Sequence, residues 1–218
     1  MNDAEIHEAV SILRKAVEKW QSPAVTIVSQ REGNPFKVLI SCILSLRTQD
    51  RTTAAASARL FALADTPERM ALLLPEEIEK AIYPVGFYRN KAAQILDICR
   101  GLLTDYDGRV PDDIDELLRF RGVGRKTANL VVTLGFGKPG ICVDTHVHRI
   151  CNRWGYVRTK NAEETEYELR AGLPGEYWLE INDLLVTFGQ NQCHPVSPRC
   201  SSCPLFSLCD RVGVGRSR

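Results

Sequence analysis

The chain has 218 residues, of which 44% are apolar, and its 28 Lys and Arg residues nearly balance 27 Asp and Glu residues. These proportions exclude a disordered chain, because a nearly neutral sequence with ordinary apolar content can bury enough surface to offset the entropy of folding. Apolar stretches such as residues 38–46 are far shorter than the ~20 residues of a membrane-spanning helix, and the acidic start does not resemble a signal peptide. We therefore expect a cytoplasmic protein, made of one moderate domain or two small ones.

Apolar residues recur every three or four positions along most of the chain, which is the spacing of a helix with one buried face. The first run consists of Ile6, Val10, Leu13, Val17 and Trp20, and similar runs cover residues 39–44 and 95–103. Sustained alternation with a period of two, which would predict strands, is not found. The sequence therefore predicts an all-α protein of roughly ten helices joined by short turns.

Signals for helix starts accompany these runs. Thr66 precedes Pro67, which is typical of a capping residue followed by proline at the first helical position. Asn161 has Glu164 three residues later, the spacing of a capping box.

The segment around residues 117–128 predicts two helices joined by a glycine turn. Gly122 and Gly124 flank Val123, so the backbone can turn tightly and present amide groups at the start of the next helix, where an anion binds well. Four cations surround this turn with no acid among them: Arg119, Arg121, Arg125 and Lys126. The segment suits a clamp for nucleic-acid phosphates, and it equally suits an ordinary helical hairpin with a solvated basic face.

Lys126 lies in the first turn of the second of these helices. The positive end of the helix dipole and the neighbouring Arg125 both disfavour a charged amine there, and a nucleophilic lysine must be neutral. A surface lysine or a simple phosphate ligand is the alternative. Asp144, eighteen residues further on, follows a turn rich in glycine and proline and precedes a helical pattern, so we expect it to be an N-cap with a fixed carboxylate.

The eight cysteines divide into two groups of four. Cys42, Cys99, Cys142 and Cys151 lie among apolar neighbours and are expected to be buried and inert. The others are crowded near the C-terminus with the spacing Cys193-x6-Cys200-x2-Cys203-x5-Cys209. Disulfides are disfavoured inside cells, so the cluster predicts a metal site, and the uneven spacing favours an iron–sulfur cluster over zinc without excluding zinc.

The hairpin, the Val143-Asp144-Thr145-His146 segment and the four-cysteine tail, in this order, resemble endonuclease III of the helix-hairpin-helix DNA glycosylase superfamily. The resemblance covers nearly the whole chain. It implies two helical halves with a DNA-binding cleft between them. Residues 24–138 would form a six-helix barrel that ends in the hairpin, and residues 1–23 and 139–218 would form a discontinuous domain with a [4Fe–4S] cluster held by the four clustered cysteines.

The resemblance also implies the chemistry. Lys126 would attack C1′ of a flipped-out nucleotide, Asp144 would be the catalytic acidic residue, and a Schiff base would permit β-elimination on the 3′ side. The implied function is a bifunctional DNA glycosylase and AP lyase that removes oxidised pyrimidines. Two alternatives are a pyrimidine-dimer glycosylase with the same residues and a non-catalytic iron–sulfur protein that binds DNA or senses oxidation. The latter would need neither Lys126 nor Asp144.

Further DNA contacts follow from the resemblance. Arg47 stands where many relatives carry a glutamine that fills the gap left by the flipped base, and Phe87 stands where a leucine often wedges against the opposite strand. His146 would line the base pocket, Arg199 would reach a phosphate from the cysteine loop, and the hairpin would contact DNA through Gly122, Val123, Gly124 and Arg125.

The net charge of +1 is a sum over separated regions. Basic clusters occur at residues 119–126, 149–160 and 211–218, and if they gather on one face, binding to DNA is strong and depends on salt. We expect a monomer that binds double-stranded DNA with damaged bases or abasic sites, in the nucleoid of a prokaryotic cytoplasm.

Overall fold

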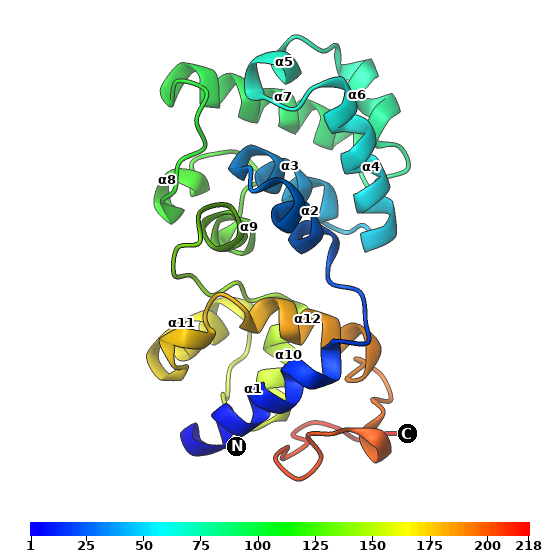
Figure 1. The fold of residues 1–218 in the computed structure, drawn as a ribbon, viewed down its shortest axis with the longest axis vertical. Coiled ribbons are helices and arrows are strands. Elements are labelled where there is room, and N and C mark those ends of the chain that lie inside the picture. Colours follow the sequence, from blue (N-terminus) through cyan, green and yellow to red (C-terminus); the bar gives the residue numbers. More distant parts are fainter. The chain divides into compact units, whose positions relative to one another are not determined.

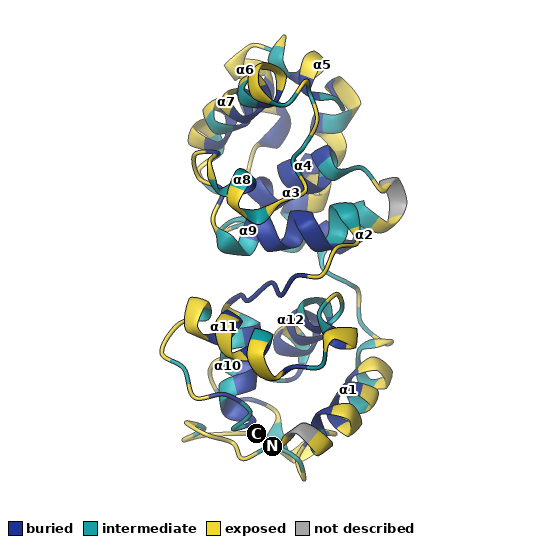
Figure 2. Ribbon diagram, turned by 90° about the vertical axis from the view of Figure 1, so that its left-hand side faces the viewer, coloured by how far each residue is buried: buried dark blue, intermediate teal, exposed yellow. Residues whose placement is uncertain are grey.

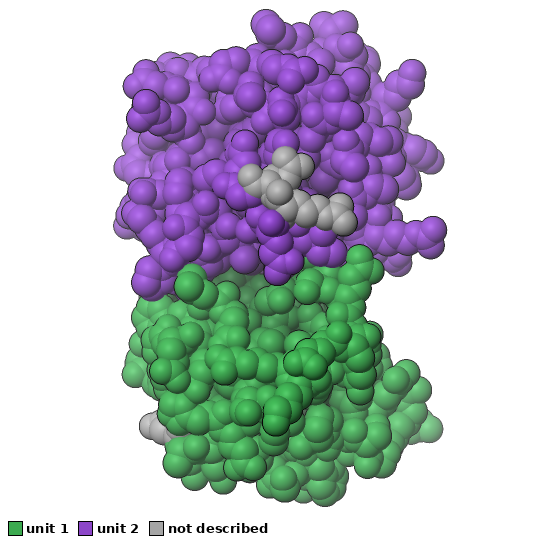
Figure 3. Space-filling view, in the orientation of Figure 1, with its two compact units in different colours: residues 1–23, 141–218 green, residues 24–140 purple. Residues whose placement is uncertain are grey.

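The computed structural model covers residues 1–218 and describes every side chain except those of Asp3, Arg31 and Glu32. In the part of the chain that is described, all regular structure is helical, which confirms the predicted all-α class (Figure 1). The chain forms two compact units (Figure 3): unit 1 consists of residues 1–23 and 141–218, and unit 2 consists of residues 24–140. Each unit is described by itself below.

Unit 2 is built from eight α-helices and one π-helical turn among the described residues. In chain order they are α2 (Ala24–Glu32), α3 (Pro35–Ser45), α4 (Asp50–Leu63), α5 (Pro67–Ala71), α6 (Pro75–Ile82), α7 (Tyr88–Asp105), α8 (Ile114–Leu118), α9 (Arg125–Leu130) and the π-helical turn η1 (Val131–Gly135). The helix predicted after the glycine turn thus changes from α to π geometry after Leu130. There the hydroxyl of Thr133 donates to the carbonyl oxygens of Asn129 and Leu130.

Helix α3 is the centre of unit 2. The side chain of Asn34 caps its start by accepting from the amides of Phe36 and Lys37, and Pro35 occupies the first helical position. From Phe36 to Leu44 every residue except Lys37 is buried, as the dark ribbon of α3 shows in Figure 2. A helix that is apolar on all sides must be surrounded by protein, and α3 contacts α2, α4, α7, α9 and η1.

Unit 1 encloses a second core. Its elements are α1 (Asp3–Val17), α10 (Thr145–Arg153), α11 (Ala162–Gly172), the 3-10 turn η2 (Gly175–Tyr177), α12 (Ile181–Asn191) and the 3-10 turn η3 (Cys200–Ser202). Helix α12 packs against both α1 and α10. Ile6, Val10 and Leu13 of α1 are buried as the periodicity predicts, and they share this core with Trp154 and Phe188.

The predicted helix starts are confirmed, with one correction. Thr66 accepts from the amide of Arg69 ahead of Pro67, and Asn161 accepts from the amide of Glu164. However, the carboxylate of Glu164 accepts from the amide of Lys160 and from the side-chain amide of Asn161. The predicted capping box therefore has its first half only, because the carboxylate reaches one residue further back than the box requires.

The four scattered cysteines are all buried, as predicted. Burial raises the pKa of the thiols of Cys42, Cys99 and Cys151 to about 12, which keeps them protonated and unreactive. Among the described helices, none is both long enough and apolar enough to cross a membrane.

The burial of α3 leads to a testable prediction. Leu39→Ala opens a cavity at a position that is 0% exposed, and we expect it to lower the free energy of unfolding by about 2–5 kcal/mol. Leu72→Ala is the matched control, because Leu72 is 84% exposed in the same unit and its loss should cost less than about 0.5 kcal/mol. Urea denaturation measures both, and equal effects would contradict the central place of α3.

Candidate functional site

The glycine turn between α8 and α9 is held by contacts that require glycine at one position. Gly122 has a φ of +79°, and a Cβ atom there would collide with the side-chain amide of Gln94. That amide donates to the carbonyl of Arg121 at 3.0 Å, so α7 holds the turn from behind. Val123 is buried and its amide donates to the carbonyl of Phe120 at 3.0 Å.

Gly124, the second glycine of the turn, is exposed. Gly124 is the N-cap of α9 in an extended conformation, no described side chain caps this end, and nothing lies within 4 Å of where a Cβ atom would stand. The first turn of a helix carries backbone amides that need partners from outside the helix. The predicted anion site therefore has the backbone geometry it needs, with Arg125 and Lys126 half-buried directly beside it.

One of the four cations predicted around this turn has another role. The guanidinium of Arg119 lies 2.8 Å from the carboxylate of Glu116, which also accepts from the hydroxyl of Tyr106. The pKa of the Glu116 carboxyl is lowered, mainly by the hydrogen bond from the Tyr106 hydroxyl and then by the hydrogen bond from Arg119. Residues 119–126 contain no acid, as the sequence shows, but Arg119 is paired with Glu116, which lies one helical turn before it.

Lys126 is near enough to α3 to interact electrostatically with a residue on it. Burial raises the pKa of the Cys42 thiol on α3, and the charge of Lys126 acts in the opposite direction. Helices α3 and α9 are also in contact. The amine thus lies at the edge of the unit 2 core, on a backbone that the glycine turn holds in place.

Asp144 is the N-cap of α10, as predicted. Its Oδ1 atom accepts from the amides of His146 at 2.7 Å and Val147 at 3.0 Å, and the residue is only 9% exposed. The structure therefore supplies a fixed, buried carboxylate at this position.

His146 is held close to α12. The guanidinium of Arg149 lies 3.0 Å from His146 Nδ1 and also donates to the carbonyl oxygens of Gly189 and Cys193. A Cβ atom at Gly189 would collide with both side chains, so glycine is required at this close approach. Sequence reasoning missed Gly189, since nothing in its neighbourhood distinguishes it from any other helical glycine.

Arg153 joins α10 to the cysteine loop, which we define as residues 193–209. Arg153 is 9% exposed, and its guanidinium donates to the Cys193 sulfur at 3.2 Å and to the carbonyl oxygens of His194 and Pro195. The Cys209 thiol lies 3.5 Å from the carbonyl of Arg153. Within the basic cluster at residues 149–160, the side chains of Arg149 and Arg153 are thus bonded to backbone carbonyl groups of residues 193–195.

The four cysteines of this loop are half-buried and form no disulfide. Cys193, Cys203 and Cys209 pack against the unit 1 core, and the thiol of Cys203 lies close enough to the other three to interact with each of them electrostatically. No three described His, Cys, Asp or Glu side chains converge as they would around a metal ion. What the loop supplies is a set of four reduced sulfur donors near a buried arginine.

Arg199 stands on the outer side of this loop. Its side chain is exposed, while its backbone is fixed by two hydrogen bonds with the buried Gln192: its amide donates to the Gln192 carbonyl at 3.1 Å, and Gln192 Nε2 donates to its carbonyl at 2.7 Å. A cation on a fixed backbone is suited to a phosphate contact.

Arg47 and Phe87, predicted from separate segments, lie together in unit 2. The guanidinium of Arg47 is 5.6 Å from the centroid of the Phe87 ring. Both residues have left-handed backbones, with φ values of 53° and 59°. Such conformations cost about 1–3 kcal/mol each in residues other than glycine and concentrate at functional sites. Phe87 is 59% exposed, so its ring is not part of the core.

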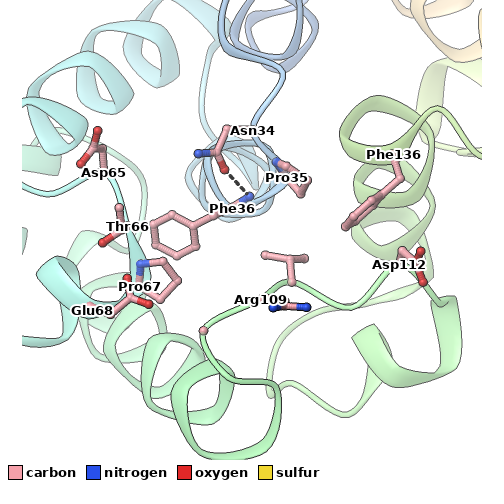
Figure 4. Close-up of a pocket in the computed structure, with 12 residues that line it drawn as sticks. Asn34, Pro35, Phe36, Asp65, Thr66, Pro67, Glu68, Arg109, Asp112 and Phe136 are labelled. Carbon is pink, nitrogen blue, oxygen red and sulfur yellow. Dashed lines mark hydrogen bonds between the residues drawn. The ribbon is translucent and has the colours of Figure 1, made fainter.

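A pocket elsewhere in unit 2 contains none of the predicted residues. It encloses about 570 Å³ between Phe36, Pro67, Arg109 and Phe136 (Figure 4). Two acids at its edge are already paired, Asp65 with Arg69 at 2.8 Å and Asp112 with Lys138 at 2.7 Å. The site predicted from the sequence therefore lies on other surfaces of the protein.

Comparison with known proteins identifies the family. Residues 40–174, which include Lys126 and Asp144, match the HhH-GPD superfamily of base excision DNA repair proteins. Endonuclease III of Thermotoga maritima is 47% identical over 193 residues, which cover 87% of this chain and 91% of that protein. Endonuclease III of Escherichia coli K12 is 39% identical over 178 residues, which cover 82% and 84%. Endonuclease III homolog 1 of Arabidopsis thaliana is 43% identical, and the match spans about half of that longer protein, 48%.

Solved structures agree with the sequence comparison. A non-covalent endonuclease III–DNA complex superimposes with a TM-score of 0.85 at 36% identity, covering 97% of this chain and 96% of that one. A trapped endonuclease III–DNA covalent intermediate gives a TM-score of 0.83 at 35% identity, covering 97% of each chain. The chain therefore belongs to the HhH-GPD superfamily and, within it, to the endonuclease III family of base excision repair DNA glycosylases and AP lyases.

Proposed function

We propose that this enzyme removes oxidised pyrimidines such as thymine glycol from double-stranded DNA, with Lys126 as the nucleophile. The observation that carries the proposal is the position of Lys126, which is the second residue of α9, after an open glycine turn without a side-chain cap. A solved endonuclease III–DNA structure contains a trapped covalent intermediate, and an amine is a nucleophile that supports such chemistry.

The reaction uses a neutral Lys126 amine. Its Nζ atom bonds to C1′ while the glycosidic bond breaks, and the bond electrons leave with the base, which is protonated. Opening of the sugar ring gives an imine between Nζ and C1′. Loss of a proton from C2′ then expels the 3′ phosphate, which cuts the strand, and water finally releases the lysine. The target nucleotide must first leave the base stack, because C1′ is not accessible inside the duplex.

Asp144 would stabilise the positive charge that develops on the sugar and would assist proton transfer. Its carboxylate is held by two backbone amides and by burial, so it does not need to be reorganised during the reaction. His146, which Arg149 and Gly189 fix against α12, would line the pocket for the flipped base.

The DNA backbone would be bound by Gly122, Val123, Gly124 and Arg125 at the glycine turn, and by Arg199 on the cysteine loop. Arg47 would fill the gap left by the flipped base, and Phe87 would wedge against the opposite strand. This division follows the chemistry of the groups: amides and guanidinium groups bind phosphates, while an exposed aromatic ring beside a cation stacks against bases.

The cysteine loop would hold a [4Fe–4S] cluster through Cys193, Cys200, Cys203 and Cys209. The donors fit in kind, because all four are cysteines without a disulfide, Cys203 interacts electrostatically with the other three, and the guanidinium of Arg153 donates to the Cys193 sulfur. The cluster would be structural: it would fix the loop that presents Arg199 and would take no part in bond breaking. We further propose a monomer that acts on damaged duplex DNA or abasic sites, in the nucleoid of a prokaryotic cytoplasm.

The lesion class and the nucleophile can be tested together. The parent enzyme should cleave a thymine-glycol duplex and leave a cyclobutane-dimer duplex uncut. Lys126→Gln should lose base release and strand cleavage by at least roughly 10³-fold. Lys80→Gln is the control, because Lys80 is an exposed lysine on α6 of the same unit. Faster cleavage of the dimer would favour the alternative lesion, and rapid base release by Lys126→Gln would refute the lysine mechanism.

Asp144→Asn separates capping from catalysis. Asparagine caps a helix about as well as aspartate, so we expect the free energy of unfolding to change by less than about 1 kcal/mol. The single-turnover rate should fall by about 10²–10⁴-fold, because the charge is lost. Asp113→Asn removes a charge from an N-cap with the same contacts, on α8, and should leave the rate nearly unchanged. Equal loss in both variants would contradict the assigned role of Asp144.

The cluster predicts a colour and a composition. Protein purified without oxygen should be yellow-brown, with absorbance near ~400 nm and equal amounts of iron and sulfide. Cys200→Ala should lose that absorbance, whereas Cys99→Ala, which alters a buried cysteine of unit 2, should keep it. A colourless protein with stoichiometric zinc would overturn the assignment.

A further inference from the structure

Lys91 is a buried lysine for which the proposed reaction has no role. It lies on α7 and is only 5% exposed. Its ammonium donates to the carbonyl oxygens of Leu44 at 3.0 Å and Leu46 at 2.5 Å, and to the hydroxyl of Thr48 at 3.3 Å. All three acceptors lie at the end of α3 or in the turn that follows it. Lys91 therefore spans the backbone on both sides of Arg47.

Thr48 extends this network to a second turn. Its hydroxyl donates to the carbonyl of Leu46 and accepts from the amide of Gly86, both at 3.2 Å. A Cβ atom at Gly86 would lie 2.7 Å from the carbonyl oxygen of Arg47, so the two turns approach more closely than any other residue would allow. The turn that carries Arg47 is thus joined to the turn that carries Phe87.

The joined turns hold two left-handed residues whose side chains are paired. Neither backbone conformation is one that arginine or phenylalanine adopts readily, so the surrounding contacts must impose it. Around Arg47 those contacts are the hydrogen bonds of Lys91 and Thr48. For Phe87 the connection is indirect, through the amide of the preceding Gly86.

The chemistry explains why a lysine stands here. The last carbonyl groups of a helix lack partners within the helix, and a cation near them is favourable. Burial works against the charge and lowers the pKa of the Lys91 ammonium to about 8. An apolar residue would avoid that cost but would leave the buried carbonyl of Leu44 without its donor.

We propose that Lys91 is a positioning residue for the recognition of paired DNA. By bonding to both sides of Arg47 it holds this residue in its left-handed conformation and locks it to the Phe87 turn, so that Arg47 and Phe87 enter the duplex as one preformed unit. This inference rests on the proposed roles of Arg47 and Phe87, and it adds a residue that would touch neither the DNA nor the reacting atoms.

The test compares a thymine glycol paired with adenine against the same lesion in an unpaired bubble. A base that is already unpaired costs less to extrude, so the bubble depends less on Arg47 and Phe87. Lys91→Met should slow single-turnover cleavage of the paired lesion about tenfold and that of the bubble less than twofold. Lys80→Met, at an exposed site on α6, should alter neither rate. A parallel loss on both substrates would show general damage to the enzyme and overturn the proposal.

Thr48→Val provides a second variant that does not depend on how Lys91→Met folds. It removes the hydroxyl that joins the two turns and leaves the lysine in place. The same selective loss on the paired lesion is expected. If this variant cleaves the paired lesion at the parental rate, Thr48 does not join the turns functionally and the proposal fails.

A double variant distinguishes the positioning role of Lys91 from the proposed DNA contacts of Arg47 and Phe87. Arg47→Ala combined with Phe87→Ala should slow cleavage of the paired lesion, and adding Lys91→Met should then change the rate less than twofold. If the double variant is unimpaired, the proposed DNA contacts are wrong, and this inference with them. If the double variant is slow but Lys91→Met alone is fast, only the positioning role is wrong.

Discussion

The backbone groups at helix ends are the constraint on which this all-helical protein depends. Each end leaves amides or carbonyls that must find partners outside the helix. Asp144 satisfies the start of α10 and becomes a fixed carboxylate, while Lys91 satisfies the end of α3 and fixes the Arg47 turn. At Gly124 no described side chain caps α9, and its open start carries Lys126. The residues proposed to act on DNA thus lie at helix ends that are either fixed by a side chain or left without a side-chain cap.

In the cysteine loop, too, charged side chains bind backbone groups that lack a partner in a helix. Arg149 and Arg153 are one turn apart on α10, and both donate to backbone carbonyl groups at the start of the loop. Asp144 caps that same helix. The loop of four cysteines is therefore bonded to the helix that begins at Asp144, and through these bonds the proposed cluster would support the proposed site without entering the reaction.

Local patterns were sufficient to predict much of this protein. Apolar spacing predicted the buried face of α1, and the turn before Asp144 predicted its cap, because these features depend on residues within a few positions of each other. The role of Lys91 could not be predicted, since its acceptor Leu46 is 45 residues away in the sequence. The bonds of Arg153 to the cysteine loop could not be predicted for the same reason, because its partner Pro195 lies 42 residues further along the chain. The sequence shows which residues are charged, but the groups to which their side chains bind depend on the fold.

The central claim is that the glycine turn presents Lys126 as the covalent nucleophile. Borohydride reduces an imine to a stable amine, so it traps the enzyme on a thymine-glycol duplex, and mass spectrometry of the digested complex then locates the sugar remnant. The account predicts the remnant on Lys126 alone. A remnant on another lysine or on the N-terminal amine, or no trapped complex from an enzyme that cleaves the duplex, would contradict it.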